Sequence, residues 1–181
     1  IKNSGSGNTN SIDNSIKINT TKRALIIKTA ESKYKKAIEI IKKNYKEDSH
    51  QKWLIYCSTI DQITKLRRLL EKEGYHFLEY HSKLSPIEKK DAMRYFKKND
   101  TVLISADMLD QGVDIPAVSH AIIISSTQNP RKSIQRRGRV LRKSEFKTFS
   151  YIYDLFVLPK NTTNKDIESS ITTAEIQRGY D

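Results

Sequence analysis

Short apolar runs alternate with amphipathic segments along most of the chain, and this alternation constrains the fold more than any other feature. Runs of about five apolar residues are typical of buried strands, and segments of about a dozen residues with apolar positions three and four apart are typical of helices. Strands and helices that alternate in this way favour a parallel sheet covered on both faces. We therefore predict an α/β fold with a mostly parallel central sheet between two layers of helices.

The elements can be assigned from apolar spacing and from turn residues. Strands are predicted over residues 23–28, 53–57, 77–80, 101–105, 120–125 and 148–157. Helices are predicted over residues 31–45 and from residue 60 to Gly74, which is expected just past the helix end. Ser85-Pro86-Ile87-Glu88 forms a capping box that opens a helix through Phe96, and Asn129-Pro130 opens another.

The chain divides into three parts by composition. Residues 1–21 are rich in Asn, Ser, Thr and Gly, which predicts a flexible N-terminal segment. Residues 22–159 form the predicted domain, and 160–181 form a polar tail with a short docking helix near 171–176. A length of 181 residues suits one domain, and because the first residue is Ile1 we expect a fragment of a longer protein.

Charge and cysteine content narrow the function classes. The formal net charge of +12 favours a polyanionic partner, either nucleic acid or nucleotide phosphates. Cys57 is the single cysteine, which excludes an internal disulfide, fits a reducing cytoplasm and is typical of a small core residue rather than a nucleophile. No apolar run approaches the roughly 18–20 residues of a membrane span, so we expect no membrane partner.

Parallel sheets bind ligands beyond the carboxyl ends of their strands, which directs attention to four loops. These loops comprise residues 58–59, 81–85, 106–116 and 125–129. His81 lies in one of them and is either a phosphate ligand or, by default, a surface residue. We expect all four loops along one edge of the sheet.

Two of the segments that follow strands carry dense charge. Residues 128–143 contain seven Arg or Lys residues and no acidic residue, and Arg136, Arg139 and Arg142 recur every third position. Guanidinium groups on one side of a helix favour binding of anionic oxygens over a merely solvated basic face. Residues 105–116 add Gly112 and three aspartates, for which a metal site is the less favoured interpretation because no His or Cys lies nearby.

These two segments resemble motifs of superfamily 2 helicases. Residues 135–142, QRRGRVLR, are similar to motif VI (QRxGRxxR), and residues 106–116 are similar to motif V. The resemblance covers about residues 31–159 and implies the C-terminal RecA-like domain, a three-layer fold. LDQGVDIP together with IQRRGRVLR resembles most the branch of XPB-type repair helicases and restriction-enzyme or phage helicases.

The resemblance implies roles for individual residues. Arg139 and Arg142 match arginine fingers that reach the γ-phosphate of ATP held by the partner RecA-like domain, a catalytic contribution by charge neutralisation. The positions that match nucleotide-facing residues are Gln135, Arg136, Gly112 and Asp114. The positions expected to contact nucleic-acid backbone are Ser58, Thr59, Lys83, Ser105 and Ala106; Ala106 stands where many relatives have Thr.

No G-x-x-x-x-G-K-[ST] sequence occurs in the chain, so ATP and Mg²⁺ are expected to bind mainly to an N-terminal RecA-like domain of the same parent protein. We predict the C-terminal half of an ATP-dependent helicase or translocase that is inactive alone. The branch resemblance implies DNA more than RNA. Two alternatives stay open: a non-catalytic RecA-like nucleic-acid-binding or interaction module, and the motor region of a restriction or defence system.

Overall fold

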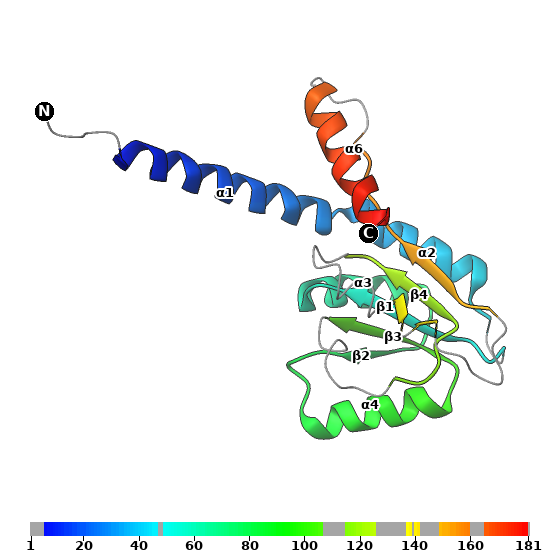
Figure 1. Ribbon diagram of the computed structural model, residues 1–181. Helices are drawn as coiled ribbons and strands as arrows, with labels where there is room; N and C mark the ends of the chain where they lie inside the picture. Colours follow the sequence, from blue (N-terminus) through cyan, green and yellow to red (C-terminus); the bar gives the residue numbers. More distant parts are fainter. Residues whose placement is uncertain are drawn as a thin grey trace, which may run out of the picture.

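The computed structural model describes residues 6–46, 49–106, 115–125, 137–138, 140–141, 149–159 and 165–180. The described elements run in the order α1 (Ser6–Lys28), α2 (Glu31–Asn44), β1 (Lys52–Cys57), α3 (Ile60–Lys72), β2 (Phe77–Tyr80), α4 (Pro86–Lys98), β3 (Thr101–Ala106), β4 (His120–Ile123), β5 (Tyr151–Asp154) and α6 (Lys165–Tyr180) (Figure 1). The strands form a five-stranded sheet in the order β2-β3-β1-β4-β5, and each neighbouring pair is parallel. The predicted α/β class and parallel sheet are confirmed.

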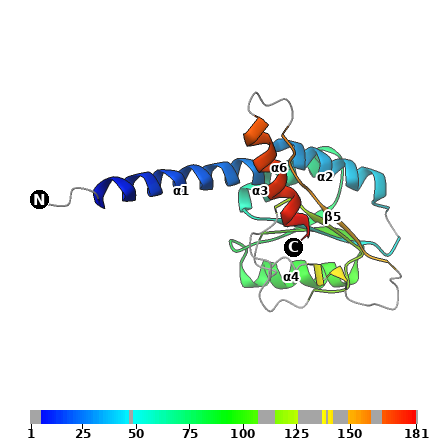
Figure 2. The same ribbon diagram turned by 45° about the horizontal axis from the view of Figure 1, so that its top comes forward.

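Apolar side chains fill the space on both faces of the sheet. On β1, Trp53 and Ile55 belong to the cluster shared with α2 and α3, whereas Leu54 and Tyr56 belong to the cluster on the opposite face, beneath α4. Successive strand residues point to opposite faces, so a strand covered on both sides is apolar throughout. Figure 2 shows α2 and α3 on one side of the sheet and α4 on the other.

The ends of α3 and α4 follow the predicted capping chemistry. Gly74 has φ +76° and lies just past α3, where its N–H donates to the carbonyl of Glu71 and the next N–H donates to the carbonyl of Leu70, both at 3.0 Å. At the start of α4, Ser85 Oγ accepts from the Glu88 N–H at 3.2 Å, and the Ser85 N–H donates to Glu88 Oε2 at 2.7 Å. Both caps are therefore as predicted.

The strand predicted over residues 23–28 is wrong, because these residues form the end of helix α1. From Ser6 onward the predicted irregular segment is helical too, and the helix extends away from the sheet (Figure 1). The hydroxyls of Thr20, Thr21 and Thr29 donate to the carbonyls four residues earlier at 2.8–2.9 Å, as helix geometry allows. A short apolar run does not distinguish a strand from a helix, and here Leu25 and Ile26 stay more than half exposed.

The C-terminal elements are close to the prediction. β5 spans Tyr151–Asp154 within the predicted strand over residues 148–157, and α6 includes the short helix predicted near residues 171–176. α6 contacts the domain through Glu175, whose Oε2 accepts from the Val157 N–H at 3.2 Å. The helix predicted to start at Asn129-Pro130 begins outside the described residues.

An aromatic stack crosses three strands on the face covered by α2 and α3. The His120 ring lies 4.1 Å from the Trp53 ring at an interplanar angle of 4°, and 4.9 Å from the Tyr151 ring. His120 Nδ1 lies 2.9 Å from Ser119 Oγ. Burial lowers the pKa of His120 to about 4, so the ring is neutral at pH 7.

Candidate nucleic-acid interface

Strand register brings several predicted site residues to one edge of the sheet. Cys57 at the end of β1 is aligned with Ala106 at the end of β3, and Tyr80 at the end of β2 is aligned with Ser105. The turn after β1 and the loop after β3 therefore start side by side. The carboxyl ends of β1, β2 and β3 lie at one edge, as expected of parallel strands, whereas most of the loops predicted at residues 106–116 and 125–129 lies outside the described residues.

The turn formed by Ser58 and Thr59 uses its two hydroxyls differently. Thr59 is the N-cap of α3, and its Oγ1 accepts from the Gln62 N–H at 3.2 Å, which leaves the hydroxyl proton to be donated elsewhere. The Ser58 N–H and Oγ both lie within hydrogen-bond distance of Gln62 Oε1, at 2.7 and 3.1 Å. Thr59 is therefore the better hydrogen-bond donor toward an anion, since the donors of Ser58 are already used inside the domain.

Gln62 is central to this edge and was missed by the sequence reasoning. Its side chain is buried, with 1% of the residue exposed, and its Nε2 donates to the Lys28 carbonyl and to Ser125 Oγ, both at 2.8 Å. The signal was present in the spacing: Gln62 stands four and eight residues before Leu66 and Leu70 on the buried face of α3. A polar residue in that row needs internal partners.

Lys33 is a buried lysine on α2. It is 2% exposed, and its Nζ donates to the carbonyl of Ile124 at 3.1 Å, just past the end of β4. The other buried residues of α2 include Ala37 and Ile41, four and eight positions later. The long apolar stem of Lys33 packs in that row, and its ammonium group reaches a backbone acceptor at the edge of the sheet.

The two positions at the end of β3 are buried. Ser105 is 0% exposed, and within the described part of the chain its Oγ has no hydrogen-bond partner. Ala106 is 7% exposed. The contact of Ser105 and Ala106 with nucleic acid stays a prediction.

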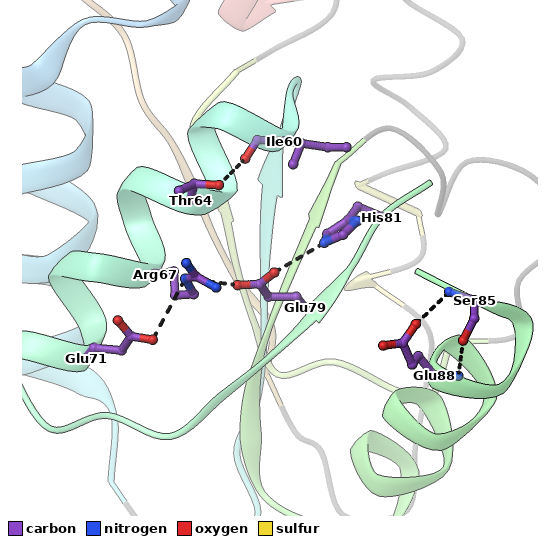
Figure 3. A network of polar contacts seen from close by, with 8 residues as sticks. All are labelled: Ile60, Thr64, Arg67, Glu71, Glu79, His81, Ser85 and Glu88. Atoms are coloured by element: carbon purple, nitrogen blue, oxygen red, sulfur yellow. Dashed lines mark hydrogen bonds and ion pairs between the residues drawn. The ribbon is translucent and has the colours of Figure 1, made fainter. Parts of the chain in front are cut away.

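The loop between β2 and α4 is held by a polar network (Figure 3). Glu79 Oε2 lies 3.2 Å from His81 Nε2, and Glu79 Oε1 lies 3.7 Å from Arg67 Nε on α3. His81 is buried at 8% exposure, so the default expectation of a surface residue is wrong. Lys83, in the same loop, is exposed and can reach an anion.

The predicted nucleotide-facing residues Gln135, Arg136, Gly112 and Asp114, and the predicted arginine fingers Arg139 and Arg142, lie outside the described residues. Within the basic segment the structure does describe Arg137, whose Nη2 lies 3.3 Å from Asp154 Oδ2. Both side chains are largely buried, and Asp154 is the last residue of β5. The pair therefore places Arg137 at the same edge of the sheet.

Metal and membrane sites are absent from the part of the chain that the structure describes. No group of three or more His, Cys, Asp or Glu side chains in these residues is arranged to hold a metal ion. Among the same residues no helix is both long and apolar enough to cross a membrane.

Comparison with known proteins relates this geometry to a family. Residues 32–144 match the model described as the helicase conserved C-terminal domain. The chain is 23% identical to DEAD-box ATP-dependent RNA helicase 22 of Arabidopsis thaliana, over 81% of this chain and 24% of the relative. It is 30% identical to the mitochondrial ATP-dependent RNA helicase MSS116 of Saccharomyces cerevisiae, over 60% of this chain and 17% of the relative.

A solved structure gives the same fold. The C-terminal domain of the DEAD-box protein Dbp5 superimposes with a TM-score of 0.61 at 22% identity, covering 82% of this chain and 81% of that one. This likeness confirms the RecA-like three-layer fold. The chain spans about a quarter or less of the length of the first curated relatives it matches.

Proposed function

Because this chain belongs to the helicase conserved C-terminal domain family of superfamily 2, we propose that it is the C-terminal half of an ATP-dependent helicase or translocase, with a carboxyl edge that binds nucleic-acid backbone. The observation that carries the proposal is the alignment of Cys57 with Ala106, because it places the turn after β1 beside the end of β3. The edge also includes the N-terminus of α3, where the positive end of the helix dipole favours anions.

On the nucleic-acid side, Thr59 and Lys83 are the described residues that we propose as phosphate contacts. Thr59 retains a hydroxyl proton to donate, and Lys83 is an exposed cation in the neighbouring loop. The net charge of +12 adds a general attraction for polyanions. Contacts of this kind recognise backbone and carry no base information, so binding is expected to be independent of sequence.

RNA is the substrate we propose, in place of the DNA implied by the branch resemblance. The relatives named above are RNA helicases by name, and they do not specifically support the XPB-type, restriction-enzyme or phage branch. Contacts made only to phosphates do not discriminate between RNA and DNA, so binding to single-stranded DNA is also expected.

On the nucleotide side, we propose that Arg139 and Arg142 act as arginine fingers and that Gln135, Arg136, Gly112 and Asp114 face the nucleotide. Support comes from the motif spacing and from Arg137, the neighbour of Arg136, whose ion pair with Asp154 lies at the edge where parallel sheets bind ligands. When ATP is bound together with Mg²⁺, mainly by the partner RecA-like domain, hydrolysis of the ATP would supply the energy for movement along nucleic acid.

The binding proposal is tested by fluorescence anisotropy. Labelled single-stranded RNA, single-stranded DNA and duplexes of several sequences are titrated with the 181-residue chain at two salt concentrations. We expect weak binding that is independent of sequence and falls steeply with salt, because counterions are released from the phosphates. Salt-independent or strongly sequence-specific binding would contradict the proposal.

The motor proposal is tested by ATP hydrolysis. The isolated chain is expected to show no ATPase activity stimulated by nucleic acid, whereas the two-domain parent protein is expected to show it. Robust turnover by the isolated chain that survives repurification contradicts the two-half arrangement. Lack of turnover by the parent protein would instead favour a non-catalytic binding module.

A further inference from the structure

The Gln62 side-chain amide joins three segments that are far apart in the sequence. Its Oε1 lies 2.7 Å from the N of Ser58 after β1, and its Nε2 lies 2.8 Å from both the Lys28 carbonyl oxygen at the end of α1 and Ser125 Oγ after β4. Gln62 itself is fixed in the first turn of α3, where its N–H is bonded to Thr59 Oγ1. One buried amide therefore connects α1, β1 and β4 at the carboxyl edge.

These bonds use the amide completely, which links them to one another. A glutamine amide has two N–H donors and one carbonyl acceptor, and here the donors serve Lys28 and Ser125 while the acceptor serves Ser58. Turning the side chain away from one partner would break its bonds to the others as well, although Ser125 Oγ also lies 3.2 Å from the Lys28 carbonyl oxygen. The orientation that bonds Ser58 is thus the same orientation that holds the end of α1.

We propose that Gln62 is a positioning residue that fastens the end of α1 to the nucleic-acid-contacting turn of Ser58 and Thr59, so that ordering the turn also orders α1. The inference rests on the proposed function, because it assigns that turn to nucleic acid. Figure 1 shows α1 leading away from the sheet. Binding at the turn and the order of α1 are then thermodynamically coupled, and such coupling acts equally in both directions.

Two near-isosteric variants separate the bonds of Gln62. Gln62→Glu keeps an oxygen acceptor for the Ser58 N–H but, when ionised, has no donor for the Lys28 carbonyl. Gln62→Met keeps the length of the side chain and removes both kinds of bond. Gln51→Glu is the matched control, because Gln51 Oε1 only accepts, from Trp53 Nε1 at 3.0 Å and from the Lys46 N–H at 3.3 Å.

The measurement is amide hydrogen exchange at Thr29 and Ser58. The Thr29 N–H is bonded to the Leu25 carbonyl at 2.9 Å and reports on the last turn of α1. We expect about tenfold faster exchange at Thr29 alone in Gln62→Glu, at both amides in Gln62→Met, and at neither in Gln51→Glu. Unchanged exchange in the core strand β1 shows that each variant is folded.

Single-stranded oligouridylate is then added to the same proteins. We expect exchange at Thr29 to slow about fivefold in the wild type and to stay unchanged in Gln62→Met. If oligouridylate binds the wild type without slowing exchange at Thr29, or if Gln62→Glu leaves Thr29 unchanged, the inference is wrong while the proposed function stands. If no single-stranded RNA or DNA binds, the proposed function fails and the coupling fails with it.

Discussion

Substitutions at Thr59 separate the structural role of this residue from its proposed contact with phosphate. Its Oγ1 accepts from the Gln62 N–H at 3.2 Å as the N-cap of α3, and its hydroxyl proton is proposed to be donated to nucleic acid. Alanine removes both functions. Serine keeps both functions, whereas aspartate keeps the cap but replaces the donor with a negative charge.

The magnitudes follow from these bonds. Loss of the cap in Thr59→Ala lowers the free energy of unfolding by about 1 kcal/mol. Loss of one hydrogen bond to a charged group is worth about 1.5–3 kcal/mol, which is roughly 10- to 100-fold in affinity. Thr59→Asp is expected to have the same free energy of unfolding as the wild type, because aspartate is a good N-cap and lies at the positive end of the helix dipole. Its affinity is expected to be the lowest, since a carboxylate repels phosphate.

The assay combines urea denaturation with anisotropy on single-stranded RNA. We expect the wild type, Thr59→Ser and Thr59→Asp to have similar stability and Thr59→Ala to be less stable. The affinity for RNA is expected to be highest for the wild type and Thr59→Ser, lower for Thr59→Ala and lowest for Thr59→Asp. Thr20→Asp on α1 is the control, because it makes the same change in net charge on an exposed residue away from the edge. If Thr59→Asp binds RNA like Thr20→Asp, no phosphate is bound at Thr59 and the reasoning is refuted.

Three further predictions concern other parts of the chain. Burial lowers the pKa of His120 to about 4, below its value of 6.5 in the unfolded chain. The free energy of unfolding is therefore highest above pH 6.5 and is expected to fall by up to about 3 kcal/mol as the pH is lowered toward 4. Urea midpoints from pH 7 to pH 4 check this, and His120→Phe should flatten the profile. Gly74→Ala is expected to destabilise by about 1 kcal/mol in urea, because alanine is strained at φ +76°, and an unchanged midpoint would contradict the assignment. In the two-domain parent, Arg139→Ala or Arg142→Ala should reduce ATP hydrolysis by about 10³–10⁵ with nearly unchanged melting temperature, and lysine should rescue poorly; near-normal turnover would remove that arginine from catalysis.

Most of the sheet and its helices could be predicted from the sequence because local and tertiary signals agree there. β1 and β3 are buried on both faces, which makes them continuous apolar runs, and Gly74 and Ser85 mark helix ends by chemistry that depends only on neighbours in the chain. The register of parallel strands then follows, and it brings Ser58 and Ala106 to the same edge.

Helix α1 and the buried polar residues were harder to predict, for two physical reasons. The apolar run from Ala24 to Ile27 has the length of a strand, yet it belongs to helix α1 and takes no part in the five-stranded sheet. Loop residues usually lie on the surface, yet His81 is buried beside Glu79, and lysines are rarely buried, yet Lys33 is buried and donates to the distant Ile124 carbonyl. Burial of such groups depends on tertiary partners that spacing alone does not show.

The turn after β1 shows why motif resemblance locates a site better than it assigns atoms within it. The resemblance placed Ser58 and Thr59 together as phosphate contacts, and both lie at the predicted edge. Their hydrogen bonds differ, because Gln62 Oε1 takes both donors of Ser58 whereas Thr59 Oγ1 only accepts from the Gln62 N–H. A phosphate that took the Ser58 hydroxyl would compete with an internal bond, and one that took the Thr59 hydroxyl would not. Thr59 is therefore expected to provide most of the binding energy at this turn, with Ser58 serving to keep Gln62 in place.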